Sequence, residues 1–259
     1  MEYSFEHGID HCGQQGIDPI LYVGGRVTEQ DFVERDLTSM RGVSIVQRGL
    51  PRGTCWDDLN LPHLFERLEN IEYLRIEYDD PISLDALGAQ TNLRYLQMDS
   101  PRVTRTFRGS MPQLTVAHVR WTDECTAKLE APLLQKLTLF RPRSKDLGLV
   151  GHLKAMRELD VHYARSLQTL EGIQPLKRLL HLGLHDCPRL TGLHIDGSTE
   201  GPQELAVAGC KRFADASDAH RFTSLRKLSI YGGSRGPRTV RLGQLQSRVE
   251  LELHGVDAA

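Results

Sequence analysis

The stretch Leu179-Leu180-His181-Leu182-Gly183-Leu184-His185-Asp186-Cys187-Pro188-Arg189-Leu190 follows the pattern L-x-x-L-x-L-x-x-C-x-x-L, and its inner L-x-x-L-x-L core returns along most of the chain. Successive copies are separated by 22, 21, 20, 22, 23, 23, 23 and 23 residues. Self-similarity at a period of about 20 to 29 residues is typical of a repeat architecture, so we expect one short unit to be stacked many times. The middle residues of the cores are Leu74, Leu96, Ala117, Leu137, Leu159, Leu182, Leu205, Leu228 and Leu251.

Each core alternates apolar and mostly polar residues. In the segment 72–77, Leu74 and Ile76 point to one side of an extended chain, and Tyr73, Arg75 and Glu77 point to the other. This period of two predicts a β-strand with one buried face. Because one strand cannot bury its leucines alone, the copies must stack on each other. Burial of each leucine contributes roughly 1.5–3 kcal/mol before conformational entropy is counted.

On this motif and spacing, the chain resembles the leucine-rich repeat family over about residues 64–254. The resemblance implies an α/β fold: a curved solenoid with a parallel β-sheet on its concave face and short helical, 3₁₀ or irregular segments on its convex face. We expect about nine such repeats within residues 67–259. The resemblance further implies a surface that binds another protein, as in adaptors, inhibitors or toxin-neutralising immunity proteins, among which the sequence does not choose.

The return segments between strands repeat as well. A second apolar column is expected at Ile82, Cys125, Leu167, Leu190 and Phe213, and a third continues through Leu170 and Leu193. Segments 148–154 and 172–178 resemble short helical or 3₁₀ turns. The position that the family usually fills with asparagine or cysteine is irregular here, so we expect an incomplete polar ladder and mobile turns near 100–110, 141–147 and 232–238. Its residues are Asp79, Pro101, Thr122, Pro142, Ala164, Cys187, Cys210, Gly233 and Val256.

The two ends of the chain depart from the regular repeat. Residues 1–66 are interpreted as a capping region with two divergent repeats, marked by strand-like runs at 20–23 and 42–46 with a Thr28-capped helix between them. The segment 48–60 reads as an insertion, and a separate small domain is the alternative to a cap. After the last strand, around 249–253, no amphipathic helix is expected, so the chain is predicted to be a monomer or a weak dimer through this uncapped edge.

Composition limits the class of function. The chain has 259 residues, of which 39% are hydrophobic and 25% are charged, and its net charge is −2. A net charge of this sign and size gives no indication of binding to nucleic acid or to an anionic membrane. No apolar stretch approaches the roughly 18 residues of a membrane helix, and the start lacks the layout of a signal peptide. The five cysteines contain no C-x-x-C pair, which favours reduced thiols and a cytoplasmic protein.

The outward side chains of the strands are the candidate binding residues. Tyrosine and arginine on a rigid scaffold are typical anchors of protein interfaces, although a merely solvated face is the simpler reading. We expect a protein partner on the concave face, with no catalytic residue, cofactor or metal. The candidate residues are Tyr73, Arg75, Tyr95, Arg120, Phe140, Asp160, His162, His185 and Tyr231.

Alternative functions have weaker support. His162 and His185, with Asp160 and His181 nearby, resemble a metal cluster, but the repeat itself imposes their spacing. We therefore expect an open face without a bound metal or an enclosed catalytic pocket. The remaining alternatives are a metal site at 7–12, a cysteine-dependent enzyme using Cys55, and nucleic-acid binding through the arginines at 102–108 and 141–143.

Overall fold

The computed structural model describes the backbone of residues 20–24 and, in full, residues 39–46, 68, 70–77, 90–99, 110–120, 123–232, 236–245 and 249–259. The described residues fall into two compact units. One comprises those up to 120 together with 128–133, and the other comprises 123–127 and 134–259. The predicted boundary between residues 66 and 67 lies outside the described residues and stays a prediction. Several other predictions also lie outside the described residues and stay predictions: the helix at 28–37, the insertion at 48–60, and the candidate sites at 7–12, Cys55 and 102–108.

The N-terminal unit is a ladder of parallel five-residue strands in sequence order. Each strand pairs in register with the next, and the two strands predicted as divergent repeats begin the ladder. The strands are β1 (Ile20–Gly24), β2 (Gly42–Val46), β3 (Tyr73–Glu77), β4 (Tyr95–Asp99) and β5 (Val116–Arg120).

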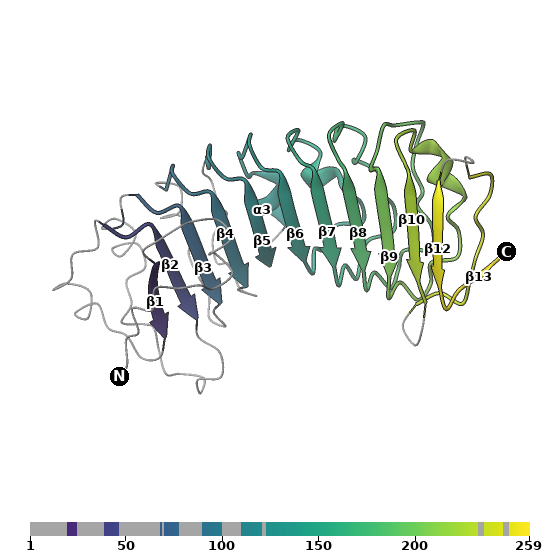
Figure 1. Cartoon of the computed structure of the whole chain (residues 1–259), viewed down its shortest axis with the longest axis horizontal. Helices are drawn as coiled ribbons and strands as arrows, with labels where there is room; N and C mark the ends of the chain where they lie inside the picture. Colours follow the sequence, from purple (N-terminus) through teal and green to yellow (C-terminus); the bar gives the residue numbers. More distant parts are fainter. Residues whose placement is uncertain are drawn as a thin grey trace. The chain divides into compact units, whose positions relative to one another are not determined.

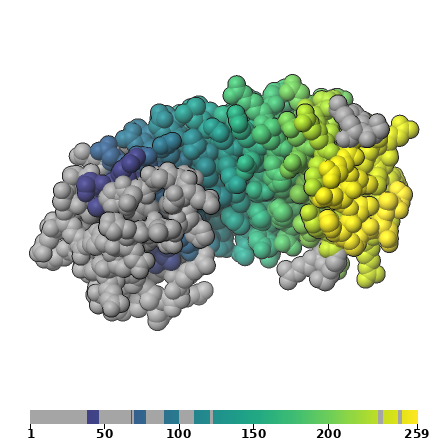
Figure 2. Space-filling model, in the orientation of Figure 1, coloured from purple at the N-terminus to yellow at the C-terminus, as the bar shows by residue number. Residues whose placement is uncertain are grey.

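The C-terminal unit continues the same plan with six strands side by side, all parallel (Figure 1). A small second ladder, β11 with β13, was not predicted. In the space-filling view, consecutive repeats of this unit lie directly against each other, from teal to yellow (Figure 2). The elements are α3 (Asp123–Ala127), β6 (Lys136–Phe140), η4 (Gly148–Val150), β7 (Glu158–His162), β8 (His181–His185), β9 (Glu204–Ala208), η5 (Ser217–Arg221), β10 (Lys227–Tyr231), β11 (Thr239–Val240), β12 (Glu250–His254) and β13 (Asp257–Ala258).

The core consists of columns of equivalent residues. Val161 lies opposite Leu184 in adjacent parallel strands and both are fully buried, which confirms the predicted solenoid register. The columns predicted for the return segments are also buried, at Cys125, Leu167, Leu190, Phe213, Leu170 and Leu193. Strands and return segments therefore enclose one apolar layer within each repeat.

The return segments contain little helix. Segment 148–154 begins with the 3₁₀ turn η4, as predicted, whereas 172–178 forms turns. The turn 141–147 is irregular but anchored, because Arg143 N–H donates to Asp123 Oδ1 at 2.9 Å and Gly148 N–H donates to Asp146 Oδ1 at 2.9 Å. Among the described residues, no helix is long and apolar enough to cross a membrane.

One backbone turn recurs after the strands of the C-terminal unit. Arg141, Tyr163 and Asp186, each the first residue after a strand, have φ of 58°, 57° and 52°. Their N–H groups donate to the last carbonyl of the next strand at 2.7, 2.8 and 2.9 Å. A left-handed residue other than glycine costs roughly 1–2 kcal/mol, and here the cost is offset by satisfying a carbonyl at the strand end.

The cysteines contribute to the polar ladder between repeats. Cys187 N–H donates to Cys210 Sγ at 3.4 Å, and Cys210 Sγ–H donates to Ala208 O at 3.5 Å. Both thiols are buried. At this position of the described residues, Pro142, Ala164 and Val256 bring no side-chain donor or acceptor, so the ladder is incomplete there, as expected.

The last long strand, β12, pairs with β10, and its inward residue Leu251 is 37% exposed. Its equivalents Leu228 and Leu205 are buried. The inner face of β12 is thus less covered than that of the strands before it.

The stacked leucines predict a sharp positional contrast in stability. Leu182 is fully buried, whereas Leu180, two residues earlier, is 40% exposed. Replacing Leu182 by aspartate is expected to destabilise the chain by more than about 3 kcal/mol, because losing a buried leucine alone costs about 2–5 kcal/mol and the buried charge adds to this. Leu180→Asp is the matched control and should change the free energy of unfolding by less than about 1 kcal/mol.

Urea denaturation followed by circular dichroism measures both variants. Equal destabilisation by the two substitutions would contradict the core assignment.

Candidate functional site

The candidate site is the outer face of the strands, formed by the first, third and fifth residue of each five-residue strand. All nine residues predicted for binding occupy such positions. The structure arranges them in ladders, because equivalent residues of paired strands are direct neighbours.

In the N-terminal unit the outer face carries a stack of rings. Tyr73 and Tyr95 stack at 4.8 Å between ring centroids with 21° between planes, and His118 follows Tyr95 at 5.6 Å. The expectation that Tyr73 is exposed is wrong: only 3% of it is accessible. Tyr73 therefore packs against the ring of Tyr95 and offers almost no surface of its own to a binding partner.

The charged residues of this unit's outer face pair with one another. Arg75 Nη2 lies 2.6 Å from Glu77 Oε1, and Arg120 Nη1 lies 3.2 Å from Asp99 Oδ1. Glu77 is itself buried, at 3% exposed, and also accepts a hydrogen bond from Gln97 Nε2 at 3.2 Å. The guanidinium groups are thus held in place by carboxylates of the same face.

In the C-terminal unit a second stack runs along the fifth strand position. Phe140 and His162 stack at 5.1 Å, and His162 and His185 stack at 4.4 Å with only 11° between planes. Tyr163, 44% exposed, lies tilted against His162 at 6.2 Å. Sequence reasoning missed Tyr163, because its position after the strand gave no sign that the left-handed turn would bring its ring to the stack.

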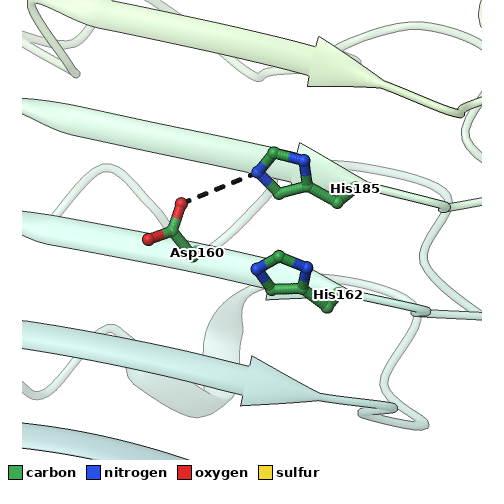
Figure 3. Close-up of side chains that lie close together, drawn as sticks. All are labelled: Asp160, His162 and His185. Atoms are coloured by element: carbon green, nitrogen blue, oxygen red, sulfur yellow. Dashed lines mark ion pairs between the residues drawn. The ribbon is translucent and has the colours of Figure 1, made fainter. Parts of the chain in front are cut away.

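Asp160 lies at the centre of this unit's polar cluster. It occupies the middle position of β7, between the buried residues Thr138 of β6 and Gly183 of β8. Its Oδ1 is 3.4 Å from His181 Nε2. The same oxygen is 3.8 Å from His185 Nε2 (Figure 3). Asp160, His162 and His185 offer ligand atoms that all lie within 4.8 Å of one another.

Gly183 is what allows these groups to converge. A Cβ built at Gly183 would lie 2.2 Å from Asp160 Oδ1 and 2.7 Å from His185 Nε2. Any larger residue would occupy the space into which the carboxylate and the imidazole lean. This glycine was not among the residues predicted for the site.

The local electrostatics shift the pKa values of His181 and His162 in opposite directions. Burial raises the pKa of Asp160, but interactions with His181 and His185 outweigh it and hold that pKa well below its usual range. The hydrogen bond to Asp160 raises the pKa of His181, against the effect of burial. Burial and the neighbouring charge of His185 lower the pKa of His162. At neutral pH the face therefore carries an ionised Asp160 beside a neutral His162.

The outer ends of this unit repeat the pattern of paired charges and stacked rings. Lys136 Nζ lies 2.7 Å from Glu158 Oε2, and Lys227 Nζ lies 2.7 Å from Glu252 Oε1. Tyr231, 40% exposed, stacks on His254 at 4.6 Å with 2° between planes. Of these residues, only Tyr231 was predicted as a binding residue.

The chain is similar to two solved structures of low identity. One is an internalin from Listeria monocytogenes, with 14% identity, a TM-score of 0.40, and coverage of 93% of this chain and 86% of that one. The other is a leucine-rich repeat protein of Leptospira interrogans, with 14% identity, a TM-score of 0.41, and coverage of 93% and 67%. No family model and no curated protein matches the chain. The fold therefore rests on the repeat spacing and strand register of the chain itself.

The electrostatic cluster predicts opposite titration of two histidines on one face. His181 is expected to titrate above, and His162 below, the value of about 6.5 of an unperturbed histidine. Asp160→Asn should lower both values, because Asp160 favours the charged form of each imidazole.

Histidine ring resonances followed by NMR during a pH titration, after removal of trace metal, test this. Glu204→Gln is the control: Glu204 lies farther from His181, with 3.7 Å between Nδ1 and Oε2, and should lower its pKa less. Identical titration of His162 and His181 would contradict the described geometry.

Proposed function

We propose that this leucine-rich repeat protein is a non-catalytic scaffold that docks another protein on the outer face of its strands, acting as an adaptor, an inhibitor or a toxin-neutralising protein. One observation carries the proposal: the rings of this face are already stacked and its charges are already paired on rigid strands. Both features lower the cost of docking.

The stacked rings reduce the entropy cost. Phe140 and His162 restrict each other's rotation, and their strands are fixed by backbone pairing on both sides of β7. Immobilising a rotamer-rich side chain on binding costs about 0.5–1.5 kcal/mol, and side chains held before binding avoid much of this. Aromatic residues so held are typical anchors of protein interfaces.

The paired charges reduce the desolvation cost. Each of Arg75, Arg120 and Lys227 keeps a carboxylate partner within its own face, so a partner that excludes water leaves no bare charge behind. An unpaired charge at an interface costs several kcal/mol. A face of this kind suits a partner with polar and aromatic groups better than a strongly charged polymer.

The same geometry supports binding over catalysis. The titratable groups of the cluster lie on a row of strand side chains that water reaches, with His185 at 31% and His181 at 34% side-chain exposure. Catalytic groups gain most from a dry surrounding in which electrostatic interactions are strong. Asp160 and His162 therefore serve the proposal as contact residues.

We also propose a reducing compartment such as the cytoplasm. Cys187 Sγ–H donates to His185 O at 3.5 Å and Cys210 Sγ–H donates to Ala208 O at 3.5 Å. Both bonds require reduced thiols, and a reducing compartment keeps cysteines in that state.

Substitutions on the two sides of the repeats test the docking face. Once affinity capture and mass spectrometry have identified a partner, Tyr95→Ala and Phe140→Ala should each weaken its binding by about 1–3 kcal/mol, because each removes an anchored ring. Arg143→Ala, in the turn 141–147, is the control and should change the affinity by less than about 0.5 kcal/mol. Titration calorimetry measures all three.

Thermal melts establish that each variant keeps its fold. If Arg143→Ala weakens binding and the two ring variants do not, the partner lies on the return segments and the proposed face is wrong.

A further inference from the structure

We infer that Asp160, His162 and His185 bind one zinc ion. The inference does not rest on the docking proposal, since the site belongs to the chain alone. Two imidazole nitrogens and one carboxylate oxygen are a ligand set that proteins use for zinc. The sequence argument against a metal was that the repeat imposes the histidine spacing; the structure shows that this same spacing brings the ligand atoms together.

The backbone places the three ligands on two adjacent rigid strands. Asp160 and His162 are the third and fifth residues of β7, and His185 is the fifth residue of β8, directly opposite His162. Their ligand atoms lie within 4.8 Å of one another. Two ligands of a tetrahedral zinc ion lie about 3.3 Å apart, given metal–ligand distances of about 2.0–2.1 Å. Side-chain rotation therefore has to close a gap of about 1.5 Å, with no movement of the strands.

His185 has the freedom to rotate. Zinc lies in the plane of each imidazole that binds it, so His162 and His185 cannot both reach one ion while their rings are parallel at 4.4 Å. On its other side His185 is paired with Ala208, whose methyl group leaves room for the ring to turn. His162 is held from behind by Phe140. Zinc binding thus opens the stack between the two histidines and leaves the Phe140–His162 stack in place.

Gly183 supplies the space for the ion. The Cβ that every other residue would add lies in the space between the carboxylate and His185, 2.2 Å from Asp160 Oδ1. Ala206 of β9, the residue paired with Gly183 on the side away from β7, is also small. The ligands therefore converge over a floor of backbone and a methyl group.

His181 contacts the carboxylate of Asp160 and positions it. Its Nε2 lies 3.4 Å from Asp160 Oδ1, while its Nδ1 lies 3.7 Å from Glu204 Oε2. Hydrogen-bonded partners of this kind orient metal-binding carboxylates, and their loss typically costs 10–100-fold in affinity. His181 is a positioning residue, and three protein ligands leave a fourth position for water or for a donor atom of a bound protein.

The test is calorimetric titration of the untagged, metal-free chain with zinc chloride. We expect one zinc ion per chain at this site, with affinity reduced at least 100-fold by His185→Ala or by His162→Ala. His181→Gln should reduce it about 10–100-fold. Magnesium chloride should give no binding, because magnesium prefers oxygen ligands.

Two further variants separate a built site from adventitious binding. His254→Ala is the matched control: His254 occupies the same strand position in β12, stacks on Tyr231 at 4.6 Å and lies 3.8 Å from Glu252 Oε2. It should leave the affinity unchanged. Gly183→Ala keeps every ligand but fills the floor, and should reduce the affinity at least tenfold. The atoms that its Cβ meets are the ends of side chains able to move, so the fold should survive, as circular dichroism can verify.

Three results would overturn the inference. They are no zinc binding by the unaltered chain, unchanged binding by folded His185→Ala, and equal loss of binding in His254→Ala and His185→Ala. The last would mean that outer-face histidines bind zinc wherever they occur.

Discussion

The in-register pairing of parallel strands is the constraint on which the rest of the structure depends. Because each strand pairs with the next without a shift, every residue faces its equivalent in the neighbouring repeat. Inside, this puts Leu159 between Leu137 and Leu182, so that apolar residues form columns. Outside, the same constraint brings like positions together whatever their chemistry, at the spacing of about 4.8 Å between strands. The strand register alone therefore determines which residues of the outer face are neighbours.

Register explains how far the sequence could predict the site. Alternation and period together predicted the nine regular strands and the buried columns, because in a half-buried strand the apolar residues at alternate positions face the core. His162 and His185 were predicted as neighbours on the same ground, and the in-register pairing of β7 with β8 places them directly opposite each other. The burial of Tyr73 was missed, since nothing in the segment 73–77 distinguishes a covered aromatic ring from an exposed one.

Other features depend on properties that a residue pattern does not carry. Arg141, Tyr163 and Asp186 take the left-handed conformation because their N–H groups reach the next strand's final carbonyl, and none of them is the glycine that would have signalled it. Nothing in the sequence indicates that Gly183 has a particular role. Only the three-dimensional positions of Asp160 and His185 show that the absent Cβ is what lets two polar groups meet.

Asp160 belongs both to the proposed docking face and to the proposed zinc site. A half-buried carboxylate between Thr138 and Gly183 has small neighbours on both sides, so its charge must be met by groups that reach over them. His181 and His185 do so, with their Nε2 atoms 3.4 Å and 3.8 Å from Asp160 Oδ1. A bound zinc ion would bring a positive charge to the carboxylate from the side of His185, while His181 would keep its contact with Asp160. Zinc binding would turn His185 out of its stack with His162 and leave Phe140 stacked on His162, so a docked protein would meet a different row of rings in the two states.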